Sequence, residues 1–246
     1  MGLMCFYRPI FIGLSAALLI ACASTKSPEE NNEAEQSVKT AKINAQLGMA
    51  YLEIGNIHRA KQKLLLALQE NSTIPEPWYS MGFFMEKTGN KEEAQKYYLK
   101  AVQIAPNRGD SHNNYGTFLC RNGHYSESIQ HFLMAVKDAS YLDSAGAYEN
   151  AGTCAMKMHD NQQAKAYFKQ ALVEDPERES ALYKMAELNY KLGDYKAAKD
   201  RLDAFVAITK PSSESQMLYA KLAPLIAKHE PSLHRRLPTN SPNDLA

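Results

Sequence analysis

The chain has 246 residues, of which 45% are hydrophobic and 22% are charged, enough for one or two globular domains or one elongated array of repeats. Its formal net charge of +1 argues against a nucleic-acid binder, because neutralising phosphates requires a concentrated basic face. Helix-favouring residues dominate the composition, and the sequence therefore predicts an all-α fold.

The N-terminal segment has the pattern of an export signal. Arg8 precedes an apolar run from Ile10 to Ala21, which is shorter than the ~20 residues of a membrane-spanning helix. Residues 1–21 are therefore predicted to be a signal peptide. The run ends in Leu19-Ile20-Ala21-Cys22, which resembles the bacterial lipobox and implies that Cys22 becomes diacylated. An ordinary secretory signal cleaved nearby is the alternative.

The segment after Cys22 indicates where the chain is held. Cys22 is followed by Ala23 and not by Asp. In this respect the chain resembles lipoproteins that are sorted to the outer membrane, so we expect a lipid anchor on the periplasmic face of that membrane. Residues 22–38 are rich in Ser, Glu and Asn, and are predicted to form a flexible tether between lipid and domain. A polar first helix is the alternative, which Pro28 disfavours.

From Ala41 onward the chain repeats every 34 residues, the period of tetratricopeptide helix-turn-helix units. Each unit has small residues where its two helices pack together, as Gly116, Ser128 and Ala135 do in the third unit. The resemblance implies a right-handed superhelix of about five to six units over residues 39–229. The units are expected at residues 41–74, 75–108, 109–142, 145–178 and 179–211, with a capping helix at 212–229.

The C-terminal region is predicted to close the array. The helix at 212–229 would cover the apolar end of the last repeat, as repeat arrays require. Pro224 predicts a kink or a break within this helix, and a degenerate sixth repeat is the alternative. Residues 230–246 hold three prolines and few apolar residues, so they are predicted to be a disordered tail.

No pattern of catalytic or metal-binding residues is present in the sequence. It contains no HExxH, CxxC, GxSxG or P-loop motif, and its seven histidines are scattered. His124 and His131 lie seven residues apart, but two exposed helical histidines are commoner than a metal site. The chain is therefore not expected to be an enzyme, and neither a cofactor, a metal nor a small-molecule substrate is predicted.

Two cysteines are expected to form a disulfide. If Cys5 leaves with the signal peptide and Cys22 is acylated, Cys120 and Cys154 remain as a pair in an oxidising compartment. Each lies near the C-terminal end of the first helix of its unit. The axes of packed helices lie ~8–10 Å apart, so inward-pointing cysteines can reach the Cα separation of roughly 5.5 Å that a disulfide needs. Two unpaired core cysteines are the alternative.

The likeness to tetratricopeptide repeats also implies a surface for a partner. In that architecture, positions 2, 5, 9, 12 and 13 of each unit face a concave groove lined by the first helices. Units one and two place apolar and aromatic residues there, and unit three places polar ones. The expected partner-binding residues are Ala45, Met49, Leu52, Tyr79, Phe83, Asn113 and Thr117. Burial of the apolar patch under the tether or a neighbouring helix is the alternative.

Two stretches of the sequence resemble one particular family of tetratricopeptide-repeat proteins. Asn113-Asn114-Tyr115-Gly116-Thr117-Phe118-Leu119-Cys120 and, one unit later, Tyr148-Glu149-Asn150-Ala151-Gly152-Thr153-Cys154 follow a lipobox. Together they resemble the PilF/PilW family of type IV pilus biogenesis lipoproteins, or pilotins, over roughly residues 15–225. This resemblance implies an outer-membrane lipoprotein that binds the secretin subunit of the pilus and promotes its localisation and multimerisation. It also supports a disulfide between units three and four.

Two other functions remain compatible with the repeats. One is a generic envelope lipoprotein that acts as an adaptor for peptidoglycan enzymes. The other is an accessory subunit of an envelope enzyme, which would require a reactive polar cluster in the groove, and the sequence contains none.

Overall fold

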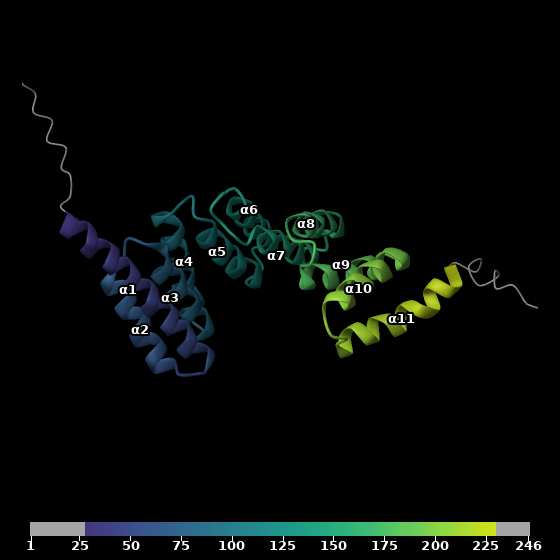
Figure 1. The fold of residues 1–246 in the computed structure, drawn as a ribbon, viewed down its shortest axis with the longest axis horizontal. Helices are drawn as coiled ribbons and strands as arrows, with labels where there is room; N and C mark the ends of the chain where they lie inside the picture. Colours follow the sequence, from purple (N-terminus) through teal and green to yellow (C-terminus); the bar gives the residue numbers. More distant parts are fainter. Residues whose placement is uncertain (1–27, 230–246) are drawn as a thin grey trace, which may run out of the picture. The chain divides into compact units, whose positions relative to one another are not determined.

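Helices form all the regular secondary structure of residues 28–229, the part of the chain that the computed structural model describes (Figure 1). The chain divides into two compact regions, residues 1–36 and 37–246. The eleven described helices are α1 (Pro28–Glu53), α2 (Ile57–Glu70), α3 (Pro75–Lys87), α4 (Lys91–Ile104), α5 (Gly109–Arg121), α6 (Tyr125–Ala135), α7 (Ser144–Lys157), α8 (Asn161–Glu174), α9 (Glu179–Lys191), α10 (Tyr195–Ile208) and α11 (Ser213–His229). The predicted signal peptide, Cys22 and the predicted tail lie outside the described residues.

Within residues 37–229, the helices pack as an array in chain order. From the second unit on, each first helix packs on the second helix of its own unit, as α3 does on α4 and α5 on α6, and each second helix packs on the first helix of the next unit. The first helices α3, α5, α7 and α9 also contact one another in succession. This arrangement confirms the predicted all-α repeat fold.

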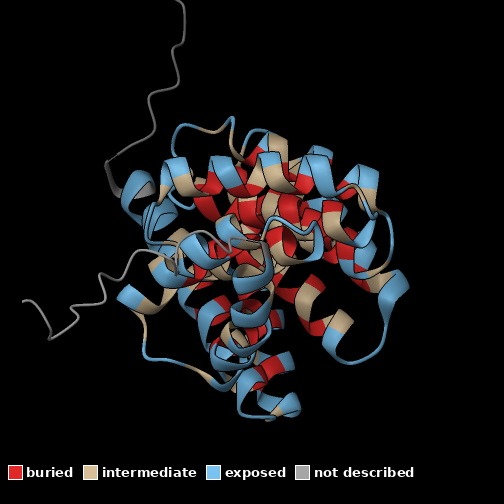
Figure 2. Cartoon of the chain, turned by 90° about the vertical axis from the view of Figure 1, so that its right-hand side faces the viewer, coloured by how far each residue is buried: buried red, intermediate tan, exposed pale blue. Residues whose placement is uncertain are grey.

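Small residues at the helix crossings explain the close packing. A Cβ atom added to Gly116 of α5 would lie 3.0 Å from the ring of Phe132 and 3.1 Å from the carbonyl oxygen of Ser128, both on α6. A larger residue would push the two helices apart. Ala135 is fully buried one turn beyond Phe132. Figure 2 shows the result, with buried residues on the helix faces that meet inside and exposed residues on the outer faces.

The turn between the two helices of a unit requires a left-handed residue. Gly123 has φ +86°, and no side chain or backbone atom lies near the place of its missing Cβ atom, so glycine adopts this conformation at little cost. In the fourth unit, His159 occupies the corresponding place with φ 63°, the one non-glycine residue with positive φ in the described chain.

The flexible tether predicted for residues 22–38 is wrong for residues 28–38, because α1 begins at Pro28 and runs without interruption to Glu53. Proline is well tolerated at the first helical position, where its missing N–H has no helical partner and its fixed φ suits the helix. Within residues 37–229, α1 is held in place by Ser37, whose hydroxyl donates a hydrogen bond to the carbonyl oxygen of Glu70 at 2.9 Å. Asn71 in turn donates to the Ser37 hydroxyl at 3.1 Å.

The capping helix is a single element, so the break considered at Pro224 does not occur. Proline leaves the carbonyl group of Ala220 without its helical partner, but Ala220 is exposed and water can replace the lost bond. Leu218 and Leu222 of α11 are buried against Leu202 of α10, where they cover the end of the array. Among the described residues, no helix is long and apolar enough to span a membrane.

Candidate partner-binding groove

A groove of about 590 Å³ lies on the first helices α1, α3 and α5. Four of the predicted partner-binding residues, Ala45, Met49, Tyr79 and Phe83, line it together. They come from two units and form its apolar surface. The remaining lining residues are Lys42, Gln46, Ala50, Glu53, Glu76, Ser80 and Asn114.

The groove also has a polar row that the sequence analysis missed. Gln46, Ser80 and Asn114 occupy the same position in three successive units, 34 residues apart, and all three line the groove. The Nδ2 atom of Asn114 donates to the carbonyl oxygen of Asp110 at 2.8 Å, which leaves its Oδ1 atom as an acceptor. The constant spacing of polar residues beside the apolar positions was the signal for this row.

Leu52 was predicted to face the groove, but it belongs to the core. It is 9% exposed and packs in a buried cluster with Leu64 of α2 and Met81 and Phe84 of α3. Its position on α1 turns it toward the neighbouring helices, where burial of a leucine contributes about 1.5–3 kcal/mol. Leu52 therefore stabilises the first two units and does not line the groove.

Asn113 and Thr117 also do not line the groove. The Oδ1 atom of Asn113 accepts a hydrogen bond from Nδ2 of Asn150 on α7 at 3.0 Å. The hydroxyl of Thr117 donates to the backbone carbonyl of Asn113 at 2.7 Å, within α5. Both side chains are hydrogen bonded within the chain, and Asn113 links the first helices of units three and four. The next residue, Asn114, is the one that lines the groove.

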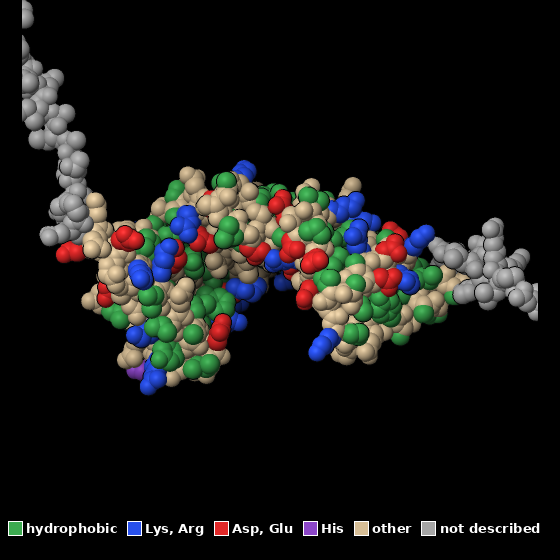
Figure 3. Space-filling view, viewed as in Figure 1, with side chains coloured by type: hydrophobic (Ala, Val, Ile, Leu, Met, Phe, Trp, Pro, Cys, Tyr) green, Lys and Arg blue, Asp and Glu red, His purple; other side chains and the backbone are tan. Residues whose placement is uncertain are grey.

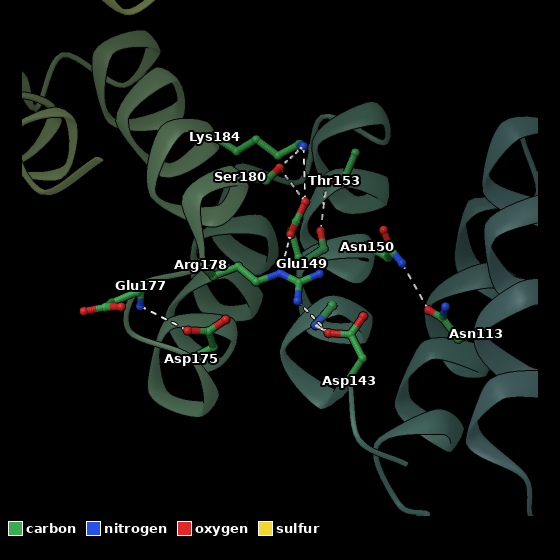
Figure 4. A network of polar contacts seen from close by, with 11 residues as sticks. Asn113, Asp143, Glu149, Asn150, Thr153, Asp175, Glu177, Arg178, Ser180 and Lys184 are labelled. Carbon is green, nitrogen blue, oxygen red and sulfur yellow. Dashed lines mark hydrogen bonds and ion pairs between the residues drawn. The ribbon is translucent and has the colours of Figure 1, made fainter. Parts of the chain in front are cut away.

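A polar network fills the concave side beyond Asn113 (Figure 4). Glu149 of α7 is 8% exposed, and its carboxylate accepts hydrogen bonds from Arg178 at 2.8 Å, Ser180 at 2.6 Å and Lys184 at 3.3 Å. Burial alone would raise the pKa of Glu149, but these hydrogen bonds and the nearby cationic charges outweigh it and lower the pKa. Arg178 also donates to Asp143 at 2.6 Å. The network joins α7 to α9.

Phe83 stands at one end of the groove between two cations. The Nζ atom of Lys87 lies 5.1 Å from the ring centroid, and the guanidinium carbon of Arg121 lies 5.8 Å from it. Arg121 donates two hydrogen bonds to the carboxylate of Glu86, each at 2.7 Å. Both cations can attract the face of the aromatic ring, which makes this end of the groove apolar and basic at once.

The opposite end of the groove is an ion-pair cluster. The Oε1 atom of Glu76 lies 2.9 Å from Nζ of Lys42 and 3.4 Å from Nη2 of Arg108, which also pairs with Asp110 at 2.7 Å. Burial, followed by the charges of Asp110 and Glu76, raises the pKa of the neighbouring Tyr79 hydroxyl, so this group stays protonated as a hydrogen-bond donor.

Comparison with known proteins agrees with this geometry. Sequence models of the tetratricopeptide repeat match residues 75–108, 97–130 and 155–222. The type IV pilus assembly protein PilF of Pseudomonas aeruginosa is 28% identical over 218 residues, which are 88% of this chain and 86% of that protein. An uncharacterised protein of Haemophilus influenzae is 30% identical over 135 residues, covering 55% of this chain and 73% of that protein.

Solved structures of PilF and PilW also resemble this chain. The structure of Pseudomonas aeruginosa PilF superposes with a TM-score of 0.70 at 27% identity, over 79% of this chain and 88% of that one. PilW, described as a widely conserved type IV pilus biogenesis factor, superposes with a TM-score of 0.68 at 24% identity, over 77% of this chain and 87% of that one. The chain belongs to the PilF/PilW family of tetratricopeptide-repeat proteins.

In this PilF/PilW-family chain, the string Asn113 to Cys120 combines several packing roles. Cys120 at the end of α5 and Cys154 of α7 form a disulfide across units three and four, with their Cα atoms 5.8 Å apart. This is the pairing expected from the sequence. Tyr115, Phe118 and Leu119 are buried against Tyr98 of α4. The string therefore fastens unit three to the units on both sides.

Titratable side chains do not assemble into a metal site in the described part of this family member. The histidine that approaches His131 is His112 rather than His124, with their Nδ1 atoms 2.8 Å apart. His112 is 5% exposed, and its Nε2 atom lies 2.8 Å from the carbonyl oxygen of Pro106. The pair joins α5 and α6 to the turn before them.

Proposed function

We propose that the chain is an outer-membrane-anchored type IV pilus biogenesis factor whose groove binds a secretin subunit and promotes its localisation and multimerisation. The main support for this proposal is the groove on α1 and α3, where Met49, Tyr79 and Phe83 present an apolar surface that the array leaves open. Kinship with PilF and PilW directs the proposal to the pilus.

The physical mechanism in this proposal is tethered capture. Two or more acyl chains on Cys22 would hold the chain stably at a membrane, since a single acyl chain gives only marginal and reversible binding. Tethering raises the effective concentration of captured subunits near one another. Cys22 lies outside the described residues, so its acylation is an expectation from the sequence.

Groove binding would keep an apolar secretin segment in solution until subunits associate. Each large apolar side chain that moves from water into such a groove contributes about 1.5–3 kcal/mol, before the cost of ordering the segment. The polar row Gln46, Ser80 and Asn114 can hydrogen bond to the backbone of a segment whose side chains contact Met49 and Phe83. Fewer polar backbone groups of the ligand would then be left unpaired.

Mass spectrometry of proteins retained by the tagged chain from detergent-solubilised envelopes tests the partner. We expect a secretin subunit with the wild-type chain and none with Phe83→Glu, because a carboxylate would be buried against the apolar ligand. Val173→Glu is the matched control, since Val173 is 72% exposed on α8 and outside the groove. Far-UV circular dichroism should be the same for all three proteins.

Two results would contradict the proposal at different levels. Unchanged secretin binding by Phe83→Glu would place the binding site elsewhere on the chain. Unchanged secretin multimers and surface pili after deletion of the gene, or retention of a peptidoglycan hydrolase instead of a secretin, would reject the function itself.

A further inference from the structure

Four consecutive first helices end on a basic residue. Helices α3, α5, α7 and α9 end at Lys87, Arg121, Lys157 and Lys191, and all four side chains are exposed. We call these four residues the basic row. Helix α1 ends at Glu53 instead, so the basic row begins at the second unit, beside Phe83, and continues away from the apolar groove.

Ion pairs and the disulfide show that these first helices run in the same direction. Arg121 and Glu86 join the C-terminal ends of α5 and α3, whereas Arg178 and Asp143 join the N-terminal ends of α9 and α7. The disulfide between Cys120 and Cys154 joins α5 and α7 close to their C-terminal ends. With the successive contacts of α3, α5, α7 and α9, this places all four C-terminal ends along one edge of the concave side. In Figure 3, a few Lys and Arg side chains lie beside the hollow between the N-terminal and C-terminal helices of residues 37–229, and others are spread over the rest of this face.

Helix capping does not account for the basic row. A cation in the last turn interacts favourably with the negative end of the helix dipole, and this effect acts on every helix. The second helices α2, α4, α6, α8 and α10 have no basic residue in their last turn. Because within the repeat units only first helices carry these cations, the row follows the concave surface and not helix ends in general.

Three of the four cations have no carboxylate partner. Arg121 is neutralised by Glu86, but Lys87, Lys157 and Lys191 form no ion pair with any residue in the range 28–229. The adjacent floor of the concave side is different, because Glu149 and Arg178 already pair with each other, and Asn113 with Asn150. The basic row is thus the part of this region that has charge available for a ligand.

We propose that the groove and the basic row together bind one extended segment of a partner protein, in which an apolar stretch adjoins acidic residues about three positions apart. Neighbouring packed helices lie roughly 8–10 Å apart, and an extended chain in the polyproline II conformation has three residues per turn and advances about 3.1 Å per residue. Every third side chain therefore points to the same side and meets the next cation. The apolar stretch lies over α1 and α3, and the acidic part follows the row toward α9. This inference rests on the proposed function, since it names the chemistry of the segment that the same groove takes.

Binding of the purified secretin subunit to the full chain, measured at increasing salt, tests the proposal. The test variant is Lys157→Glu/Lys191→Glu, because neither lysine lines the groove. We expect about tenfold weaker binding than wild type at about 50 mM salt, and a difference that disappears near 500 mM as charges are screened. The matched control, Lys61→Glu/Lys169→Glu on the second helices α2 and α8, changes the net charge equally and should bind like wild type.

The outcomes separate this inference from the proposed function. If the double variant binds the secretin subunit as wild type does at low salt, the role of the basic row is overturned while the function stands. If wild type binds no secretin subunit, the function fails, and two synthetic peptides decide the inference. One has an apolar tetrapeptide followed by Glu at every third position, and its twin has Gln at those positions. Tighter binding of the Glu peptide supports the inference, and equal binding overturns it.

A membrane is the competing ligand for a row of cations. Vesicles of phosphatidylcholine with added phosphatidylglycerol should therefore be compared with the secretin subunit as ligands. Loss of vesicle binding by Lys157→Glu/Lys191→Glu, with secretin binding unchanged, would assign the row to lipid and overturn the inference.

Discussion

The Nδ1 atoms of His112 and His131 lie 2.8 Å apart, and only one of the two rings can donate in this contact. The Nε2 atom of His112 faces the carbonyl oxygen of Pro106 at 2.8 Å, so it carries the hydrogen. With its hydrogen on Nε2, His112 presents a bare Nδ1 atom, and the N–H of His131 donates to it. Burial, and then the neighbouring His112, lower the pKa of His131 to about 4.

This pair predicts a loss of stability in mild acid. An unfolded chain protonates His131 near pH 6.5, whereas the folded chain resists protonation until about pH 4. The stabilisation is therefore complete above pH 6.5 and is lost as the pH falls toward 4. Because His131 is only half-buried, we expect a loss of about 1 kcal/mol between pH 7 and pH 5. Urea unfolding of wild type and His131→Phe at both pH values measures this loss, which should be larger for wild type. Equal losses in the two proteins would contradict the assignment to His131.

The disulfide predicts a large difference between oxidised and reduced protein. Closing the loop between Cys120 and Cys154, which are 34 residues apart, should stabilise the fold by about 3–4 kcal/mol through the entropy of the unfolded chain. Cys120→Ser/Cys154→Ser should lower the free energy of unfolding by that amount, and reductant should have no further effect on the variant. Alkylation of both cysteines in unreduced, denatured protein, detected by mass spectrometry, would exclude the bond.

Gly116 predicts a steric cost at the crossing of α5 and α6. Gly116→Ala gains up to about 1 kcal/mol of helix propensity, but its Cβ atom would meet the ring of Phe132 at 3.0 Å. We expect a net loss of about 1–2 kcal/mol in unfolding free energy. In a double-mutant cycle with Phe132→Leu, the combined loss should be smaller than the sum of the single losses. Strict additivity would show that the ring is not the obstacle.

The network around Glu149 in Figure 4 should stabilise the contact between α7 and α9. Glu149→Ala removes the carboxylate shared by Arg178 and Lys184, both partly buried, and should cost about 1–3 kcal/mol of unfolding free energy. Glu93→Ala breaks the exposed pair with Lys96 on α4 and should cost less than about 0.5 kcal/mol. Equal costs for the two variants would mean that burial adds nothing to the Glu149 network.

The repeat itself can be read from the sequence, because each unit must meet the same local requirements. Glycine at Gly123 and small residues such as Gly116 recur at a fixed spacing, since a left-handed turn and a close helix crossing leave few alternatives. Helices α3, α5 and α9 accordingly begin at Pro75, Gly109 and Glu179, where the sequence pattern begins its units. The apolar half of the groove followed from the same periodicity.

Only the tertiary structure decided which side chains the groove exposes. Leu52, Asn113 and Thr117 occupy positions that face the groove in other arrays, yet Leu52 is buried against Leu64, and Asn113 is bonded to Asn150. These partners come from other helices, so spacing within one helix cannot reveal them. Likewise, Pro28 disfavours a helix interior but suits a helix start, and the choice between them depends on where α1 begins. Local geometry repeats along the chain, whereas its neighbours in space decide whether a polar group is hydrogen bonded within the chain or exposed in the groove.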